Sequence, residues 1–495
     1  MPTFAKALMV QGTGSDAGKS LLVAGLCRAF AKRGLKVRPF KPQNMSNNAA
    51  VTSDGGEIGR AQALQARACG VEPHTDMNPV LLKPEGETGA QLVVGGKMRG
   101  QVKPKDFRTF KETLLDDVLA AFARNKDDCD LVIVEGAGAP SEVNLRAGDI
   151  ANMGFATAAN VPVVLAGDVE KGGVIAQVVG THAVLMPSER DLIKGFIVNK
   201  FRGDVSLFDS AMTDMEARTG WTPLGVVPWF AGAAKLPKED SASLGRWAET
   251  GRGGAGRIRI ALPKFPRIAN FDDLDPLMAE DDVDVMLIEA GEPLPGDVDV
   301  VVLPGSKSVV SDLKYLKAEG LEVDIAAHLR RGGLVVGLCG GYQMLGKWIS
   351  DPDGMESPAG PVGEEPALGL MDVETVLTDD KALEHVKGVE AASGLDIAGY
   401  EMHLGLTEGP DRSTPWFHLE DGREEGAISA SGQVMGTYVH GVFASDAFRH
   451  GFLARLREDR EGGAAYEQGV EDALDELAHH LEACLDLDAI LALAD

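Results

Sequence analysis

The chain has 495 residues, more than a single hydrophobic core usually holds, so its length predicts about two or three domains. Its 75 acidic residues outnumber its 48 basic ones, and the resulting net charge of −27 argues against binding to the phosphate backbone of nucleic acids. No run reaches the roughly 18 apolar residues of a membrane span, and the five cysteines show no C-x-x-C pairing, so we expect a cytoplasmic protein without disulfides or a zinc site.

The first 235 residues alternate short apolar runs with amphipathic stretches, which is typical of a mostly parallel sheet covered on both faces. A helix is expected over 20–33, because Gly34 follows it as a C-cap. Residues 81–97 are expected to form a hairpin or an inserted excursion. The strand candidates are 7–12, 36–40, 131–136, 161–168 and 194–200. These elements predict an α/β domain over residues 1–235.

The first strand runs into Thr13-Gly-Ser-Asp-Ala-Gly-Lys-Ser20 and then into the expected helix. In that context backbone amides bind phosphate, the Lys19 ammonium reaches the terminal phosphates and the Ser20 hydroxyl reaches Mg²⁺, although Thr13 stands where the strict motif has glycine. A dinucleotide-binding fold is the alternative, but the second strand ends in Phe40-Lys-Pro-Gln-Asn44, without the acidic residue that a ribose needs. We therefore predict an ATP site. Its nucleotide-binding residues are Thr13, Gly14, Ser15, Gly18, Lys19 and Ser20.

Two acidic residues stand where a magnesium nucleotide could use them. Glu135 ends the apolar run 131–135, and a carboxylate at the carboxyl end of a parallel strand points into the ligand crevice. Asp54 lies in an Asp-Gly-Gly sequence, so a turn residue is the alternative for it. Because Mg²⁺ prefers hard oxygen ligands, both carboxylates are candidate ligands beside Ser20.

Four amide side chains follow the second strand, close to the expected nucleotide crevice. They are Gln43, Asn44, Asn47 and Asn48. Amides of this kind can contact the carboxylates and amides of a substrate. A polar loop whose side chains cap its own backbone is the alternative.

Residues 236–256 are polar and glycine-rich without a sustained period, so we expect a linker there. A second α/β domain is expected over 257–495. Its strand candidates are 257–265, 283–291, 298–306 and 332–341, with later strands near 399–405 and 434–441. An acidic helical tail from about residue 466 completes the second domain as we expect it.

Cys339 lies between an apolar strand and an amphipathic helix, among glycines that allow a tight turn. This is the arrangement of a nucleophile elbow, in which the helix N-terminus favours the thiolate and the Gly340 amide can stabilise an oxyanion. The turn after the strand 298–303 offers a second donor, the amide of Gly305 or of Ser306. A buried core cysteine is the alternative, and the small neighbours argue against it.

A thiolate nucleophile needs a base within hydrogen-bonding reach. His440 fits best among the ten histidines, because it directly follows a strand of alternating character. His403 is its rival. The pattern predicts nucleophilic catalysis by Cys339 with His440 as its base.

The N-terminal motifs resemble the dethiobiotin synthetase-like ATPases, through the loop that begins with Gly12-Thr13 and through Glu135-Gly-Ala-Gly138. The resemblance implies a P-loop fold in which Ser20, Asp54 and Glu135 hold Mg²⁺. It also implies that Asn199 and Lys200 recognise the base of ATP. The chemistry it implies is formation of an acyl phosphate from a carboxylate.

The C-terminal motifs resemble class I glutamine amidotransferase domains over roughly 257–450. The matching segments are Leu303-Pro-Gly-Ser-Lys-Ser308, Gly337-Leu-Cys-Gly-Gly-Tyr-Gln-Met-Leu-Gly346 and Thr437-Tyr-Val-His-Gly441. Most such domains carry glutamate two residues after the histidine, where this chain has Val442. The resemblance is therefore to the subgroup that works with a Cys-His pair, and it names no group that orients His440.

The two domains in this order, with Lys41-Pro-Gln-Asn-Met-Ser-Asn-Asn48 and Gly399-Tyr-Glu-Met-His-Leu-Gly405, resemble the cobyric acid synthase family along nearly the whole chain. The resemblance implies ATP-dependent amidation of the b, d, e and g carboxylates of adenosylcobyrinic acid a,c-diamide with ammonia from glutamine. The partners it implies are the corrinoid, L-glutamine and a second copy of the chain through the P-loop domain. The alternatives are a cobyrinic acid a,c-diamide synthase and a non-catalytic regulatory protein built from the same two domains.

Overall fold

The computed structural model describes residues 5–84, 89–102, 104–237, 257–356, 361–460 and 462–494. The chain forms two compact units. Unit 1 comprises Met1–Ser46, Thr52–Pro237 and Val470–Asp495, and unit 2 comprises Asn47–Val51 and Lys238–Gly469. Residues 238–256, most of the expected linker, lie outside the described residues.

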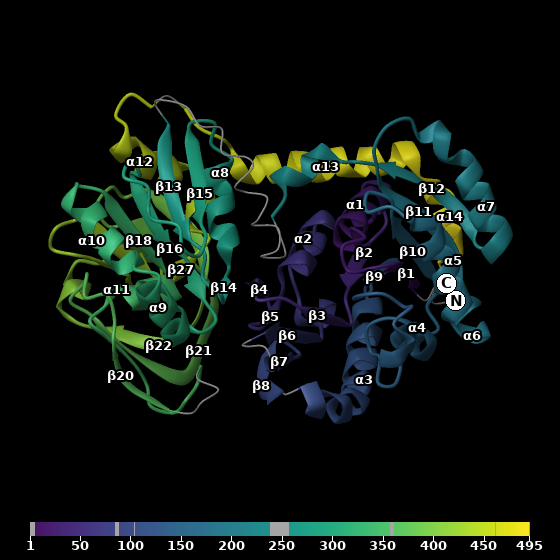
Figure 1. Ribbon diagram of the computed structural model, residues 1–495, viewed down its shortest axis with the longest axis horizontal. Coiled ribbons are helices and arrows are strands. Elements are labelled where there is room, and N and C mark those ends of the chain that lie inside the picture. The colour runs from purple at the N-terminus through teal and green to yellow at the C-terminus, as the bar shows by residue number, and fades with distance from the viewer. Residues whose placement is uncertain are drawn as a thin grey trace. The chain divides into compact units, whose positions relative to one another are not determined.

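Unit 1 is built on a six-stranded parallel sheet with the strand order β12-β11-β10-β1-β9-β2 (Figure 1). The strands are β1 (Lys6–Gly12), β2 (Val37–Phe40), β9 (Leu131–Glu135), β10 (Val163–Asp168), β11 (Ile193–Phe201) and β12 (Thr222–Pro228). The helices are α1 (Lys19–Lys32), α2 (Arg60–Ala68), α3 (Pro104–Lys126), α4 (Met153–Ala159), α5 (Val174–Val184), α6 (Pro187–Arg190) and α7 (Asp209–Thr219). The expected parallel sheet is confirmed, and β12 is a strand that the sequence analysis did not identify.

Both faces of this sheet are buried because successive strand residues point to opposite sides. On one face Ala7 and Met9 of β1 pack in a cluster with Phe122 of α3 and Phe155 of α4. The alternate residues of β1 face α1. Two covered faces explain why the strands read as continuous apolar runs rather than as alternating ones.

A smaller sheet in unit 1 has the order β3-β6-β7-β8. Its strands are β3 (Gln43–Met45), β6 (Val80–Pro84), β7 (Ala90–Val94) and β8 (Lys97–Val102), and the short β4 (Ala49–Val51) and β5 (Glu57–Gly59) lie nearby in sequence. β6 and β7 pair antiparallel, which confirms the expected hairpin, although residues 85–88 lie outside the described residues.

The C-terminal helices are α13 (Tyr466–Cys484) and α14 (Leu487–Leu493), and the chain belongs to unit 1 from Val470 onward. At Gly25 of α1 an added Cβ would lie 2.5 Å from Leu481 Cδ1, so the glycine allows α13 to pack closely. Arg28 pairs with Glu471 at 2.7 Å and with Asp475 at 2.6 Å. The expectation that the tail belongs to the second domain is therefore wrong, because its apolar face and its acidic residues are matched by α1.

Unit 2 contains a six-stranded sheet with the order β15-β13-β16-β18-β26-β25, parallel except for the last strand. The strands are β13 (Ile258–Pro263), β15 (Val283–Ile288), β16 (Val300–Leu303), β18 (Leu334–Leu338), β25 (Ala427–Ile428) and β26 (Val434–Thr437). The helices are α8 (Asp275–Met278), α9 (Val309–Ala318), α10 (Leu321–Arg330), α11 (Gly340–Leu345) and α12 (Asp446–Leu456).

A second, mixed sheet of unit 2 is organised around the long antiparallel pair β21–β22. Its strands are β19 (Trp348–Asp351), β20 (Val362–Pro366), β21 (Glu374–Glu390), β22 (Asp396–Glu408), β23 (Phe417–Leu419), β24 (Glu424–Glu425) and β27 (Val439–His440), and β14 (Ile268–Ala269) pairs separately with β17 (Gly305–Ser306). β27 pairs with β22, so His440 is fixed at the edge of this sheet. Among the described helices, none is long and apolar enough to cross a membrane.

Candidate functional sites

Cys339 occupies a sharp turn between β18 and α11. Its φ of 52° and ψ of −109° lie in a region that side chains rarely adopt, so the turn is strained. At Gly341 an added Cβ would lie 2.0 Å from Leu303 O, which shows that only glycine allows α11 to pass so close to β16. The expected strand–turn–helix arrangement is confirmed, and the turn holds the thiol at the carboxyl end of the sheet.

His440 is held by a carboxylate that the sequence analysis did not identify. Asp273 Oδ2 lies 2.7 Å from His440 Nδ1, and Asp273 Oδ1 accepts a hydrogen bond from the Gly441 amide at 2.7 Å. Both side chains are buried. Because the carboxylate fixes Nδ1 as the protonated nitrogen, Nε2 is left for Cys339.

The charges around His440 favour its imidazolium form. Burial opposes charging, but the negative charges of Asp273 and Cys339, together with the hydrogen bond from the ring to Asp273, outweigh it and raise the pKa of His440 to about 10. Removing either negative charge would lower this pKa. The arrangement therefore stabilises the imidazolium form of His440 between the Asp273 carboxylate and the Cys339 sulfur.

His403, the rival base, has a different environment. Its ring stacks on Tyr438 with centroids 3.7 Å apart. Burial and the positive charge of His440 lower the pKa of His403 to about 4, so His403 is neutral near pH 7. Within the described chain His403 has no hydrogen bond to a carboxylate, whereas His440 has one to Asp273. The geometry favours His440 as the base.

The two expected oxyanion donors lie on neighbouring backbone segments. At Gly340 an added Cβ would lie 2.8 Å from Ser306 N, and at Gly305 it would lie 3.3 Å from His440 Cε1. The chain at Gly305–Ser306 therefore passes close to both the cysteine turn and the imidazole. A side chain at Gly340 would meet Ser306, and one at Gly305 would meet Ala269 and the His440 ring.

All of these groups follow the carboxyl ends of strands in the parallel sheet of unit 2. Asp273 follows β13, Gly305 follows β16, Cys339 follows β18 and His440 follows β26. Parallel strands place their carboxyl ends at one edge, where ligands bind in α/β folds. Val442 lies buried in the short turn after His440 and has no polar role.

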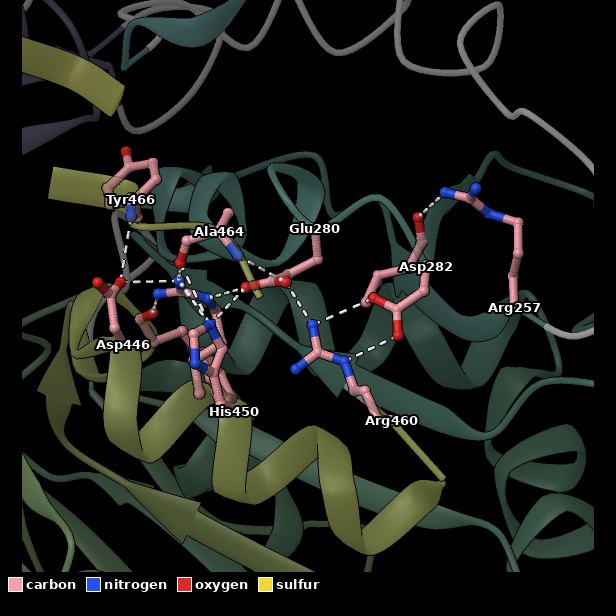
Figure 2. Close-up of polar contacts among 11 residues, drawn as sticks. Arg257, Glu280, Asp282, Asp446, His450, Arg460, Ala464 and Tyr466 are labelled. Atoms are coloured by element: carbon pink, nitrogen blue, oxygen red, sulfur yellow. Dashed lines mark hydrogen bonds and ion pairs between the residues drawn. The ribbon is translucent and has the colours of Figure 1, made fainter. Parts of the chain in front are cut away.

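A buried ion network joins the chain segments that follow His440 and Asp273. Arg449 of α12 donates to Glu280 Oε1 at 2.6 Å and to Phe443 O at 2.7 Å. Phe443 lies three residues after His440, and Glu280 lies seven residues after Asp273, so the guanidinium ties together the segments that carry the pair. The other groups that converge on Glu280 are the side chains of His450 and Arg460 and the amide of Ala464 (Figure 2).

Arg449→Met should destabilise unit 2 by about 3–5 kcal/mol, because removing one partner of a buried ion pair leaves the other poorly solvated. The guanidinium of Arg449 is fully buried. The measurement is the urea midpoint of unfolding. Arg218→Met is the matched control, since Arg218 pairs with Asp214 on an exposed helix face, where such pairs contribute about 0–1 kcal/mol. Equal midpoints for both variants would contradict this account.

In unit 1 the expected phosphate loop connects β1 to α1. Lys19 Nζ donates to the carbonyls of Gly14 at 2.9 Å and of Gly138 at 3.2 Å. Gly18 has a φ of 83°, and an added Cβ there would lie 2.5 Å from Asn199 Nδ2. The loop therefore needs glycine at this position, and the Lys19 ammonium lies close to the backbone that would surround phosphate.

Asn199 and Lys200, at the end of β11, contact the same loop. Asn199 Nδ2 donates to Ala17 O at 2.9 Å, and Lys200 Nζ donates to Asp16 O and pairs with Asp168 at 2.9 Å. The structure thus brings both residues to the nucleotide-binding candidates. Thr13 Oγ1 donates to the side chain of Gln177 at 2.8 Å.

Glu135 joins the phosphate loop to the polar segment that follows β2. Its Oε1 accepts hydrogen bonds from Ser20 Oγ and from Lys41 Nζ, each at 2.8 Å, and its Oε2 accepts from Gln65 Nε2 at 2.6 Å. Burial raises the pKa of Glu135, but the charge of Lys41 and these hydrogen bonds outweigh it and lower the pKa. The carboxylate is therefore ionised beside Ser20.

Asp54 forms a different set of contacts. Its carboxylate accepts hydrogen bonds from Thr75 Oγ1 at 2.5 Å and from Thr75 N at 3.2 Å, and it is partly exposed. Ser20 and Glu135 are hydrogen-bonded to each other. Among the described residues, Asp54 has no hydrogen bond to either of them. Within those residues no group of three or more His, Cys, Asp or Glu side chains could hold a metal ion.

Comparisons with known proteins identify the two domains in which these sites lie. Residues 8–244 match the CobQ/CobB/MinD/ParA nucleotide binding domain, and residues 259–448 match the CobB/CobQ-like glutamine amidotransferase domain. Cobyric acid synthases of Rhodobacter capsulatus, Methylorubrum populi and Rhizorhabdus wittichii are 58%, 57% and 56% identical to this chain, each over 99% of both sequences. This chain belongs to the cobyric acid synthase family. It is therefore a glutamine-hydrolysing amidotransferase with a nucleotide-binding domain.

The four amide residues that follow the second strand, which we predicted as candidate substrate contacts, are divided between the units. Gln43 and Asn44 belong to unit 1, where Asn44 Nδ2 donates to Gln62 Oε1 at 2.9 Å. Asn47 and Asn48 belong to unit 2. Two of the four thus lie in the unit with the phosphate loop, and two lie in the unit that carries Cys339.

Proposed function

We propose that the chain catalyses ATP-dependent amidation of the b, d, e and g carboxylates of adenosylcobyrinic acid a,c-diamide, with ammonia released from glutamine. The observation that carries the proposal is the identity of 56–58% to cobyric acid synthases over 99% of the chain. The thiol–imidazole–carboxylate set of unit 2 and the phosphate loop of unit 1 support its two half-reactions.

Glutamine hydrolysis begins when the Cys339 thiolate attacks the carboxamide carbon of glutamine. The amides of Gly305 and Gly340 donate hydrogen bonds to the oxyanion, and the His440 imidazolium gives its Nε2 proton to the departing ammonia. The neutral imidazole then takes a proton from water, which cleaves the thioester to glutamate and regenerates the thiolate. Asp273 stabilises the imidazolium each time it forms.

In unit 1 a substrate carboxylate attacks the terminal phosphoryl group of ATP, and ammonia then displaces phosphate from the acyl phosphate. Lys19 is placed to bind the transferring phosphoryl group, and Asn199 and Lys200 to bind the nucleotide. Ser20 and the ionised Glu135 fit Mg²⁺ as hard oxygen ligands, and Asp54 remains the proposed third ligand. Bound Mg²⁺ would neutralise charge on the phosphate oxygens.

The corrinoid is proposed to contact Gln43 and Asn44, together with two glutamines of α2. Gln62 and Gln65 are fully buried, and Gln62 Nε2 and Gln65 Oε1 have no hydrogen-bond partner within the described chain. Uncharged amides can donate to a carboxylate and can also pair with a carboxamide. Such a lining suits a substrate whose carboxylates become amides one after another. Asn47 stays a candidate contact, since its Oδ1 is buried without a partner among the described groups.

Two further proposals concern the setting of the enzyme. All five cysteines are free thiols, which supports the proposed reducing cytoplasm. The proposed homodimer through unit 1 has its test in the molar mass measured by light scattering. A monomeric mass at micromolar concentration would contradict it.

Cys339→Ala tests the proposed function. It should abolish glutamine hydrolysis and glutamine-driven amidation, because no other group supplies the nucleophile, while ammonium-driven ATP turnover is retained. The assay measures glutamate and ADP with adenosylcobyrinic acid a,c-diamide, and with cobyrinic acid as the substrate of the alternative synthase. Cys129→Ala is the matched control and should keep both activities. Retained glutamine hydrolysis in Cys339→Ala, or stimulation by cobyrinic acid alone, would contradict the proposal.

A further inference from the structure

A short segment of the N-terminal half belongs to the unit that carries Cys339. Asn47–Val51 is part of unit 2, although Ser46 and Thr52 on either side belong to unit 1. Asn48 in this segment is buried, with 1% of its surface exposed. A buried amide side chain needs a hydrogen-bond partner, and a partner of Asn48 lies in unit 2.

Asn270 forms hydrogen bonds with Asn48 and with the next residue, Ala49. Asn48 Oδ1 accepts from the Asn270 amide at 2.8 Å, and Asn270 Oδ1 accepts from the Ala49 amide at 3.3 Å. Asn270 is itself buried and has a φ of 50°, a left-handed conformation that asparagine tolerates better than most residues. The two bonds therefore fix both the side chain and the backbone of an unusual turn residue.

Asn270 stands between two parts of the glutamine-hydrolysing site. On its C-terminal side it begins the turn Phe271–Leu274, and its carbonyl accepts from the Asp273 amide at 3.2 Å. On its N-terminal side Ala269 pairs with Gly305 in the β14–β17 ladder. The residue that Asn48 holds thus connects the carboxylate that orients His440 to the strand that carries a proposed oxyanion donor.

We propose that Asn48 is a positioning residue for glutamine hydrolysis, which acts by holding the Asn270 turn so that Asp273 and Gly305 keep their places beside Cys339 and His440. The inference rests on the proposed function of that site. It assigns Asn48 to the glutaminase and not to substrate contact.

Asn48→Ala is the first test, with glutamine hydrolysis measured in the presence and absence of ATP and adenosylcobyrinic acid a,c-diamide. We expect kcat for glutamine hydrolysis to fall about 10- to 100-fold with little change in KM, because small misplacements of catalytic groups cost this much. Ammonium-driven amidation should stay at the wild-type rate. The alkaline limb of the pH profile should move to lower pH, since His440 loses part of its contact with Asp273.

Asn48→Asp and Asn270→Gly refine the test. Asn48→Asp keeps an oxygen that can accept from the Asn270 amide, so it should recover part of the lost kcat. Asn270→Gly keeps the left-handed backbone but removes the bond to Ala49, so its effect should not add to that of Asn48→Ala. Ser413→Ala, at an exposed position of unit 2, is the control and should retain wild-type kcat.

The outcomes separate this inference from the proposed function. Wild-type glutaminase in Asn48→Ala would overturn the inference, as would a parallel loss of glutamine- and ammonium-driven amidation, which is the result expected of a substrate contact. A fall in kcat that follows a lowered thermal midpoint, with an unchanged pH profile, would also overturn it, because it would show only a structural role. Loss of activity in Cys339→Ala tests the proposed function independently.

Discussion

Replacing Asp273 by asparagine should lower kcat for glutamine hydrolysis by about 10²- to 10⁴-fold while ammonium-driven amidation continues. An asparagine of the same shape can present its amide NH₂ to His440 Nδ1, which favours the wrong tautomer of the ring and leaves Nε2 protonated. It also removes the negative charge that stabilises the imidazolium. Binding of glutamine does not depend on this group, so KM should change little.

The pH profile gives a second and more specific readout of Asp273→Asn. The pKa of His440 is raised to about 10 by Asp273 and Cys339, so the imidazolium of the wild type persists as the pH rises from neutral toward that value. With one of the two charges removed, the imidazolium loses its proton at lower pH. The alkaline limb of kcat/KM should therefore move to lower pH.

Asp272→Asn is the matched control for this experiment. It changes the neighbouring carboxylate of the same turn, which is not the one bonded to His440, by the same isosteric substitution. We expect its alkaline limb to coincide with that of the wild type. An unshifted limb in Asp273→Asn, or a kcat within a few fold of the wild type, would show that His440 is oriented by another group.

The parts of the site that the sequence predicts are those whose geometry is local. Cys339 is flanked by glycines, which a strained turn between a strand and a helix requires. The residues next to it in the sequence therefore predict the nucleophile elbow. The phosphate loop is similar, because Gly18, Lys19 and Ser20 act within one strand–loop–helix unit. In both cases the residues that make the structure are consecutive.

Asp273 could not be assigned from the sequence because its partner lies 167 residues away. The chain has many aspartates, and Val442 at the usual glutamate position indicated only that a partner was missing. One signal was available: Asp273 follows a strand of the same parallel sheet, whose carboxyl edge also carries Cys339. A search for carboxylates after each expected strand would have included it.

The C-terminal tail and the segment around Asn48 show a second limit. Amphipathic periodicity identifies α13 as a helix with one apolar face, but it does not say which core that face joins. The close packing at Gly25 and the ion pair of Arg28, both in α1, show that this face packs in unit 1. Asn48 likewise lies within an N-terminal motif, and its hydrogen bond with Asn270, which the sequence does not indicate, joins it to unit 2.

Lys19→Ala should abolish amidation with either nitrogen source, by about 10³-fold or more, and leave basal glutamine hydrolysis intact. The Lys19 ammonium lies against the loop carbonyls of Gly14 and Gly138, where it can follow the phosphoryl group from ATP to the carboxylate. In phosphoryl transfer nearly all catalysis comes from positioning and charge stabilisation, so loss of one buried cation is costly. The measurement is amide formation with glutamine and, separately, with ammonium, beside glutamate release without the corrinoid.

Lys194→Ala controls for the loss of a lysine from unit 1. Lys194 is exposed near the start of β11, at the opposite end of that strand from Asn199 and Lys200, and should keep wild-type activity. The decisive result is the contrast between the two variants. Lys19→Ala should lose amidation and keep glutamine hydrolysis, whereas Cys339→Ala should lose glutamine hydrolysis and keep ammonium-driven ATP turnover. Residual ammonium-driven amidation within about tenfold of the wild type would remove Lys19 from the transfer step. Parallel loss of glutaminase would instead mean that the phosphate loop supports the folding of both units, and the assignment of one half-reaction to each unit would fail.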